Sequence, residues 1–529
     1  MILSYFLSRK SQTTTYNYDK INRVIRADYA DGSNTAYTYN AVGRLTTVSD
    51  SVIGTISYTY SDTGCPSCGG VDKLIQEVTL LGGINYSYDA IGRRTSMTVS
   101  GQPAVSYNYD AVSRLIQVAQ GTQVVNLGYD AAGRRTNLSY PNGTNSSYFY
   151  DNASRLTEIL HQGPSGIIED IRYANDAIGN RISFSRTGSQ ADLPAEVQAA
   201  YNAANQLTNW NNATPNLTYD NNGNLVSKTD STGTTSYTWD ARNRLTAISG
   251  PGISANFVYD ALGRRISKTI NGVTTQYLYD GNDIIAEIQN STISATYLRS
   301  LNIDEPFIRQ STSAEYYHTD ALGSALSLTD STGAVQTTYS YEPFGRVYQR
   351  GQSSTNPFQY TGRENDGTGL YYYRARYYSP ELQRFISEDP IRFAGRDINF
   401  YTYVGNSPVN FVDPYGFFSV DVGGGATVGF FDFTYGYNSG LGASLTNPQF
   451  GAGGFVCINI CNSPAPPLEG CYGPTIEDEP LEEQPITVSV GVGRRSGVSV
   501  TTDLCTICIN YGWSWGGLPI NIGIPIQIQ

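Results

Sequence analysis

Residues 86–94, Tyr-Ser-Tyr-Asp-Ala-Ile-Gly-Arg-Arg, form a short unit that recurs along the chain. Its two tyrosines stand two residues apart, so both rings leave the same face of a β-strand. Asp89 can turn the chain by hydrogen-bonding its own backbone, and Gly92 can take the positive φ that closes the turn. Arg93 then starts the return strand, where it can pair with an aspartate or stack on a neighbouring tyrosine. The unit predicts a tight turn between two antiparallel strands.

The Tyr-Asp pair of this unit repeats every 20 to 21 residues, with looser intervals around Cys65 and between residues 157 and 200. A second turn, of the Asp-Gly or Asn-Gly type that favours hairpins, stands between copies at residues 31–32, 142–143 and 271–272. Each repeat is therefore predicted to be a β-hairpin, and stacked hairpins form one long antiparallel sheet. The pairs are Tyr18-Asp19, Tyr88-Asp89, Tyr109-Asp110, Tyr129-Asp130, Tyr150-Asp151, Tyr219-Asp220, Tyr259-Asp260 and Tyr279-Asp280, with degenerate copies at Tyr39-Asn40, Tyr201-Asn202 and Trp239-Asp240.

The amino-acid composition favours an all-β protein. Among 529 residues there are 42 Tyr against 18 Phe, and 54 Gly, while only 15% are charged. Tyrosine suits half-buried strands, where the ring packs and the hydroxyl reaches water or a partner. A long antiparallel sheet must twist and curl. From the residues alone, a winding hollow shell, a flat fibre and a propeller all remain open.

The charge of the chain limits its partners. The net charge is −12 and the isoelectric point is near 4.8, so we expect no nucleic-acid binding by the shell. No apolar run is long enough to predict a transmembrane helix, and the apolar start lacks the basic region of a signal peptide. Because the chain opens within two turns of a repeat, we expect a partial shell that lacks an upstream portion and leaves an open edge strand.

From residue 316 the repeats give way to a run of aromatic and Gly-Arg motifs that ends at residue 417. It contains two Asp-Pro pairs, at residues 389–390 and 413–414. Proline fixes the backbone, so each aspartate is held at a stiff turn. Two carboxylates that lie close together do not both ionise readily, and the resulting acid beside a base is what an aspartyl-type hydrolase needs. On spacing alone, two ordinary turns are the favoured explanation of the pairs.

The repeats and this run together resemble the YD-repeat family, which includes Rhs proteins, wall-associated proteins, Tc toxin C subunits and teneurins. The resemblance covers roughly residues 12–417. It implies a sheet that spirals into a hollow cocoon. It also implies three parts: a YD-repeat β shell (1–315), an Rhs-associated core with a self-cleavage motif (316–417), and a variable, β-rich C-terminal passenger domain (418–529).

In this family, the matching aspartates cut the chain just after the second Asp-Pro motif. The resemblance therefore implies that Asp389 and Asp413 are the catalytic pair of an aspartyl-type autoprotease. The cleavage site would be the bond between Phe417 and Phe418. Arg384 is expected to hold one of the two carboxylates by a bidentate contact.

Two residues depart from the family pattern around the first Asp-Pro pair. Arg392 stands where members with an Asp-Pro-Ile-Gly motif have glycine. Glu388 stands where some cleaving members carry arginine. A third carboxylate at this position is expected to raise the pKa values of the pair and to slow cleavage.

The histidines and the first cysteines give no separate catalytic motif. His318 is expected to bond across the sheet as a strand residue, and His161 to lie in a Gly-containing loop, so no histidine cluster is predicted. Cys65 and Cys68 form a lone Cys-x-x-Cys, for which a hairpin tip or local disulfide is favoured over half a zinc site or a redox pair. We therefore expect no metal and no cofactor.

Residues 418–529 lose the repeat and alternate apolar with small or polar residues. The alternation predicts a hairpin over 486–500 and another strand run over 520–528, with a loop over 464–485. The five cysteines of this part are expected to be buried or in disulfides, with a zinc site as the alternative. They are Cys457, Cys461, Cys471, Cys505 and Cys508.

The chemistry open to this tail is narrow. It holds nine Asp and Glu, two Arg, no Lys and no His, which gives a net charge of −7. A His-dependent nuclease or a zinc deaminase is therefore not expected. The activities that remain open to the tail are binding, membrane insertion, or carboxylate chemistry by Asp421, Asp432 or Asp503.

The main hypothesis is a carrier of the polymorphic-toxin type, whose shell encapsulates the passenger and releases it by self-cleavage after Phe417. Its partners would be its own passenger and an immunity protein. The alternative is a cell-surface adhesion or carbohydrate-binding protein with an uncleaved chain, whose exposed tyrosines bind sugar. Either hypothesis places the protein in the secreted or cell-surface class. The passenger's target, the export route and the oligomeric state do not follow from the sequence.

Overall fold

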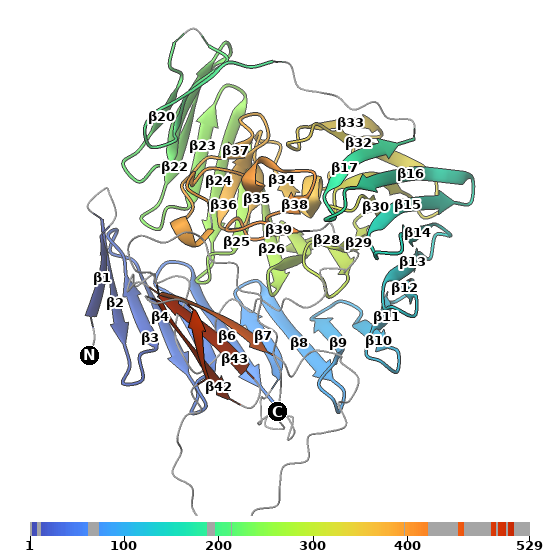
Figure 1. Ribbon diagram of the computed structural model, residues 1–529, viewed down its shortest axis with the longest axis horizontal. Coiled ribbons are helices and arrows are strands. Elements are labelled where there is room, and N and C mark those ends of the chain that lie inside the picture. Colours follow the sequence, from blue (N-terminus) through green and yellow to red (C-terminus); the bar gives the residue numbers. More distant parts are fainter. Residues whose placement is uncertain are drawn as a thin grey trace, which may run out of the picture. The chain divides into compact units, whose positions relative to one another are not determined.

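The computed structural model describes residues 3–7, 12–61, 73–187, 196–212, 214–395 and 397–421, together with four strands between residues 453 and 512 (Figure 1). The chain divides into two compact units, one of residues 1–62 and 73–442 and one of residues 63–72 and 443–529. In the described part, the regular structure is β-strand with three single-turn 3-10 helices, so the all-β prediction is confirmed. No helix in that part is long and apolar enough to cross a membrane.

The first unit begins with a 17-stranded antiparallel sheet in which each strand pairs with the next along the chain. This is the arrangement that stacked hairpins predict. The strands are β1 (Leu3–Leu7), β2 (Thr13–Tyr18), β3 (Val24–Asp28), β4 (Asn34–Tyr39), β5 (Leu45–Asp50), β6 (Gly54–Tyr60), β7 (Leu74–Thr79), β8 (Gly82–Tyr88), β9 (Arg94–Val99), β10 (Val105–Tyr109), β11 (Leu115–Gln120), β12 (Gln123–Tyr129), β13 (Arg135–Ser139), β14 (Asn145–Tyr150), β15 (Leu156–Gly163), β16 (Gly166–Asn175) and β17 (Arg181–Arg186).

A short hairpin and a second, 14-stranded antiparallel sheet follow. The second sheet continues through residue 316 without a break, so the boundary expected there marks a change of sequence motif and not of sheet. The hairpin is β18 (Ala199–Tyr201) and β19 (Leu207–Trp210). The sheet is β20 (Leu217–Tyr219), β21 (Leu225–Asp230), β22 (Gly233–Trp239), β23 (Leu245–Gly250), β24 (Ile253–Tyr259), β25 (Arg265–Ile270), β26 (Val273–Asp280), β27 (Asp283–Gln289), β28 (Thr292–Arg299), β29 (Pro306–Gln310), β30 (Ala314–Thr319), β31 (Ala325–Thr329), β32 (Val335–Tyr341) and β33 (Val347–Gly351).

The regular repeat turns are built alike, and the turn at Asp89 shows how. Asp89 Oδ1 accepts the backbone N–H of Arg93 at 2.9 Å, and Gly92 has a φ of +82°. Arg93 Nε donates to Asp89 Oδ2 at 2.6 Å, and the guanidinium lies 4.8 Å from the ring centroid of Tyr109 in the next repeat. The pairing and the stacking expected of the arginine therefore both occur. They recur at Arg23 with Asp19 and Tyr39, Arg114 with Asp110 and Tyr129, Arg134 with Asp130 and Tyr150, Arg244 with Asp240 and Tyr259, and Arg264 with Asp260 and Tyr279.

The tyrosine before each turn aspartate sits at a shift in strand register. The shift falls between Ser87 and Tyr88, and at the same place in the neighbouring repeats. Such a bulge re-aims a side chain. Tyr88 Oη thus reaches back and donates to the carbonyl of Leu74 at 2.8 Å, at the start of the preceding strand. Tyrosine and arginine together link each repeat to the repeats on both sides.

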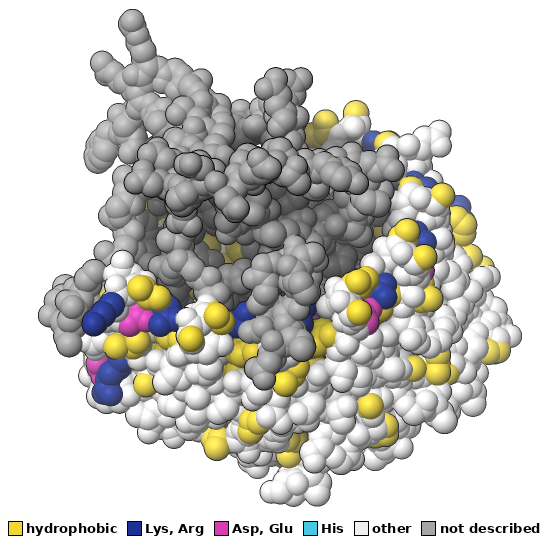
Figure 2. Space-filling view, turned by 90° about the horizontal axis from the view of Figure 1, so that it is seen from below, with side chains coloured by type: hydrophobic (Ala, Val, Ile, Leu, Met, Phe, Trp, Pro, Cys, Tyr) yellow, Lys and Arg dark blue, Asp and Glu magenta, His cyan; other side chains and the backbone are white. Residues whose placement is uncertain are grey.

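The two faces of the sheets differ. In β8, Ile84 and Tyr86 are buried whereas Asn85 and Ser87 are exposed. The exposed face carries uncharged amide and hydroxyl pairs. The face in Figure 2 accordingly shows few charged side chains among uncharged ones. Uncharged polar side chains on the exposed face therefore explain how the chain keeps a large polar surface with few charged residues.

The buried faces of the two sheets pack on each other in one core. Residues of β8 to β13 lie in the same apolar cluster as residues of β26 to β30. Polar links also join the sheets: Asp280 accepts Tyr86 Oη at 2.9 Å and pairs with Arg94 at 2.5 Å. Whether the sheets close into a shell stays a prediction.

The segment after β33 is compact and rich in buried tyrosine. It holds a four-stranded sheet that lies against β23 to β25, with Tyr372, Tyr377 and Ile386 in one cluster with Leu245 and Phe257 (Figure 1). Its elements are η2 (Tyr360–Gly362), β34 (Glu364–Asn365), β35 (Tyr371–Tyr373), β36 (Arg376–Ser379), β37 (Arg384–Phe385), η3 (Arg392–Gly395), η4 (Val404–Asn406), β38 (Phe411–Val412) and β39 (Val420–Asp421).

The second unit contains one described sheet of four antiparallel strands, in the order β40 (Gly453–Asn459), β43 (Thr506–Gly512), β42 (Ser496–Asp503) and β41 (Val488–Val492). β41 and β42 form the hairpin predicted over 486–500. The register places Cys457 opposite Cys508. The loop predicted over 464–485, the strand run over 520–528, Asp432, and Cys65, Cys68, Cys461, Cys471 and Cys505 lie outside the described residues.

Candidate self-cleavage site

The first Asp-Pro turn holds Asp389 by its backbone and by its side chain. It lies a few residues after β37, and its N–H donates to the carbonyl of Phe400 at 2.9 Å. Asp389 Oδ1 accepts the N–H of Ile391 at 2.9 Å, which fixes the carboxylate at the start of the turn. The second carboxylate oxygen, Oδ2, makes the contact of Asp389 with the rest of the site.

The second Asp-Pro turn places Asp413 against the predicted cleavage bond. Asp413 follows β38, and its Oδ1 accepts the N–H of Phe417 at 2.9 Å and that of Phe418 at 3.2 Å. The Phe418 nitrogen belongs to the peptide bond between these two phenylalanines. One oxygen of Asp413 therefore touches the nitrogen that a cleavage there would release.

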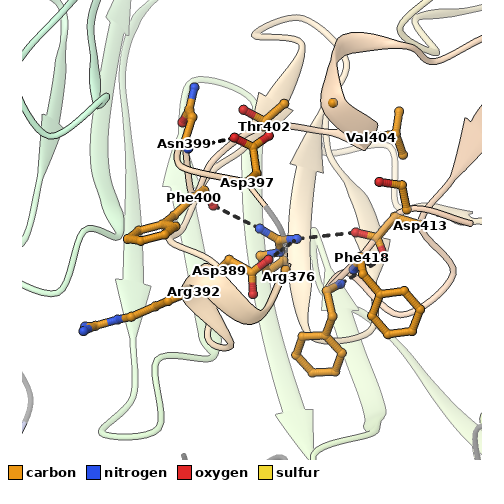
Figure 3. A pocket seen from close by; sticks show the side chains of 14 residues that line it. Arg376, Asp389, Arg392, Asp397, Asn399, Phe400, Thr402, Val404, Asp413 and Phe418 are labelled. Carbon is orange, nitrogen blue, oxygen red and sulfur yellow. Dashed lines mark hydrogen bonds and ion pairs between the residues drawn. The ribbon is translucent and has the colours of Figure 1, made fainter. Parts of the chain in front are cut away.

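Arg376 on β36 joins the two aspartates. Its Nη2 lies 3.1 Å from Asp389 Oδ2 and 3.4 Å from Asp413 Oδ2 (Figure 3). Its other nitrogens donate to the carbonyls of Gly416 at 2.5 Å and Phe400 at 3.0 Å. The guanidinium is buried, so it is fixed from four sides between the carboxylates.

Gly395, at the end of η3, reveals how closely Asp389 approaches the same bond. A Cβ atom at Gly395 would lie 2.8 Å from Asp389 Oδ2 and 3.0 Å from the carbonyl oxygen of Phe417. Both oxygens therefore border the same glycine. Asp413 thus accepts the N–H of the Phe417–Phe418 bond, while Asp389 borders the same glycine as the carbonyl oxygen of that bond.

Burial sets the protonation of this pair. Burial raises the pKa of Asp389 to about 6, against the opposing effect of Arg376. Burial likewise raises the pKa of Asp413, which Arg376 and the N–H donors only partly offset. Two buried carboxyls that share one guanidinium supply an acid and a base near neutral pH.

A small pocket opens on the site. It is lined by Arg376, Asp389 and Asp413, by both phenylalanines of the predicted bond, and by Gly395. The pocket has room for a water molecule. The arrangement therefore brings together two carboxyls, a peptide bond and space for a nucleophile.

Arg384 does not occupy the place expected for it. Its guanidinium donates to the carbonyl of Asn205 at 2.8 Å and to Asn399 Oδ1 at 3.3 Å, and Arg376 fills the position between the carboxylates instead. The expectation failed because both arginines lie in the same motif-rich run, and strand register alone decides which one points at the pair. Arg376 and Gly395 were missed for the same reason.

The two departures from the family pattern have different consequences. Arg392 has a φ of +48°, in the left-handed region that favours glycine, so the fold keeps the glycine geometry at a cost of roughly 1 kcal/mol. Glu388 lies on the other side of the chain, against Gly223 and the Tyr401 hydroxyl. Its side chain therefore packs against the repeat turn at Gly223, and its expected effect on the pKa values of the pair stays a prediction.

The two histidines correct another expectation. His161 lies on β15, not in a loop, and its ring packs edge to face on His318 of β30 with centroids 5.2 Å apart. His318 does bond across the sheet, to Thr329 Oγ1 at 3.0 Å. Burial lowers the pKa of His161 to about 4, so both rings are core residues. The described residues contain no group of His, Cys, Asp or Glu suited to a metal ion.

Comparison with known proteins settles the family. Residues 2–162 and 142–409 match the model of the teneurin YD-shell family. The chain belongs to this family. It is also similar over 76% of its length to the crystal structure of TcdB2-TccC3, with a TM-score of 0.54 and 18% identity, and covers 28% of that chain. At this identity the likeness concerns the fold.

The curated relatives of this chain include proteins named as a nuclease and as a toxin subunit. The chain is 31% identical over 269 residues to the tRNA nuclease WapA of Bacillus subtilis (strain 168), which is 46% of this chain and 11% of that protein. It is 34% identical over 108 residues to toxin subunit YenC1 of Yersinia entomophaga, which is 19% of this chain and 11% of that protein. The chain thus spans about a tenth of the length of these relatives.

Proposed function

We propose that this chain is the shell of a polymorphic-toxin-type protein that encloses the C-terminal passenger and cuts it free after Phe417. The observation that supports the proposal is that Arg376 joins Asp389 to Asp413, and that Asp413 accepts the N–H of the Phe417–Phe418 bond. The toxin and nuclease names of the relatives support a toxic role for the passenger. These names also favour a protein that acts outside the cell that produces it.

The cleavage follows from the two positions. Protonated Asp389 polarises the Phe417 carbonyl, whose oxygen borders the same glycine, Gly395, as Asp389 Oδ2. Ionised Asp413 takes a proton from a water molecule in the pocket, and the water oxygen bonds to the carbonyl carbon as Asp389 gives its proton to the carbonyl oxygen. Arg376 contacts both carboxyl groups and stabilises the single negative charge that the pair carries.

Collapse of this tetrahedral intermediate completes the reaction. The C–N bond breaks, the proton on the intermediate returns to Asp389, and Asp413 passes the water-derived proton to the Phe418 nitrogen. The products are a carboxyl group on Phe417 and a free amine on Phe418. Asp413 is well placed for this transfer because its Oδ1 already accepts the Phe418 N–H.

The test is the fate of the tail in aspartate variants. Asp389→Asn and Asp413→Asn should each abolish a tail fragment on a denaturing gel, because the pair needs one acid and one base. Asp397→Asn is the matched control: Asp397 lines the same pocket, but its carboxylate accepts the N–H of Asn399 at 2.8 Å. Release of the tail by both catalytic-pair variants would refute the aspartyl assignment.

A further inference from the structure

Three consecutive repeat turns lack the arginine of the regular unit. The turns at residues 176–180, 202–206 and 220–224 end in Asn, Gln and Asn. These amides bond within their own turns, as Asn180 Nδ2 does to Asp176 Oδ2 at 2.8 Å. An amide carries no charge and is too short to stack on the tyrosine of the next repeat as Arg93 does. The ladder that links regular repeats therefore lacks its arginines over this stretch, and at the third turn an amide bond to the next repeat, from Asn224 Nδ2 to Asn243 Oδ1 at 2.9 Å, takes their place.

The core segment supplies contacts at two of these turns. Arg384 donates to the carbonyl of Asn205 at 2.8 Å, and its guanidinium lies 5.2 Å from the ring centroid of Tyr201. A core arginine thus stacks on a repeat tyrosine where the repeat's own arginine is missing. At the next turn, the Tyr401 hydroxyl donates to the carbonyl of Gly223 at 2.8 Å. The N–H of Leu225 donates to the carbonyl of Ile386 at 2.9 Å.

The same core segment carries half of the cleavage site. Asp389 lies between Ile386 and Tyr401, and Arg384 also bonds to Asn399. The next residue, Phe400, accepts both the N–H of Asp389 and Nη1 of Arg376 through its carbonyl. Each docking contact is therefore at most a few residues from a group that fixes the catalytic pair.

We propose that docking of the irregular repeats 199–225 on the core orders the cleavage site, so that the chain is cut only after this part of the sheet has formed. Gly223, Arg384 and Tyr401 are positioning residues in this account. The inference rests on the proposed self-cleavage. Its consequence is that the passenger stays covalently attached until the repeats around the core have folded.

Gly223 offers a sharp test because the core lies directly against it. A Cβ at Gly223 would lie 2.6 Å from Glu388 Cγ and 2.6 Å from the Tyr401 hydroxyl. Gly263 is the matched control, since it occupies the same place in a regular turn and has a similar φ, +85° against +83°. A Cβ there meets nothing within 4 Å. Both alanine variants carry the same backbone strain, but only Gly223→Ala pushes the core away.

The experiment measures tail release over time in cell-free translation of the full chain, beside the thermal midpoint of each purified protein. Gly223→Ala should slow cleavage at least tenfold relative to Gly263→Ala, while both purified proteins still unfold in a cooperative thermal transition. Adding Glu388→Ala to Gly223→Ala should restore part of the rate, because it removes one of the two displaced side chains. Equal cleavage rates in the two glycine variants would overturn the inference while leaving self-cleavage intact. An uncleaved wild-type chain would overturn both.

Discussion

Gly395→Ala places a single methyl group against both Asp389 Oδ2 and the Phe417 carbonyl oxygen. Its carbon would lie 2.8 Å from Asp389 Oδ2 and 3.0 Å from the Phe417 carbonyl oxygen. Carbon–oxygen contacts normally begin at about 3.3 Å, so at least one oxygen must move by roughly 0.5 Å. A misplacement of about 1 Å can cost about 100-fold in rate. We therefore expect cleavage to slow by about 10- to 100-fold.

The folded state should tolerate this change. Overpacking costs about 1–3 kcal/mol, and replacing glycine returns about 0.4–1 kcal/mol through the unfolded chain where the native φ suits alanine, as at Gly395. The control is Gly83→Ala, whose Cβ would make only ordinary contacts, the nearest at 3.7 Å to Val78. The assay is the appearance of the tail on denaturing gels during cell-free translation. Wild-type kinetics in Gly395→Ala would refute the geometry assigned to Asp389.

Three further predictions concern charge. Cleavage should slow as the pH rises through about 6, because Asp389 then loses the proton it needs. The cleavage rate is measured by stopping refolding at successive times, and a rate that rises steadily to pH 9 would contradict this prediction. Arg376→Gln should abolish cleavage and lower the free energy of unfolding by about 3–5 kcal/mol, since it leaves two buried carboxyls without a cation. Urea titration measures this loss, and a variant as stable as wild type would count against the role of Arg376. The protein should lose stability as the pH falls from about 6.5 to 4, because unfolded His161 takes up a proton that the buried ring does not. This effect is worth about 3 kcal/mol and should shrink in His161→Gln, so identical pH profiles would exclude it.

The repeat architecture was predictable because its decisive contacts are local. Asp89 bonds two and four residues ahead, and Arg93 reaches one repeat along. Such contacts recur at a fixed spacing, so the pattern of tyrosine, aspartate, glycine and arginine reveals them. The YD-repeat fold and the sequential antiparallel pairing both follow from that pattern.

The site was predictable only in part, because its remaining contacts join distant segments. The Asp-Pro pairs and the resemblance pointed to Asp389 and Asp413. Nothing local distinguishes Arg376 from Arg384, because each precedes an aromatic residue in a strand pattern. The contact of His161 with His318 spans the two sheets and leaves no sequence signal. These placements depend on how the sheets and the core pack.

The intact mass of the purified full-length protein under denaturing conditions tests the central claim most directly. The account predicts two chains in place of one of 57.7 kDa: a large shell that ends at Phe417, and a tail of about 12 kDa that begins at Phe418. Their masses should sum to that of the intact chain plus one water molecule. A single mass of 57.7 kDa, or a new end at any other residue, would contradict self-cleavage of the Phe417–Phe418 bond by Asp389 and Asp413.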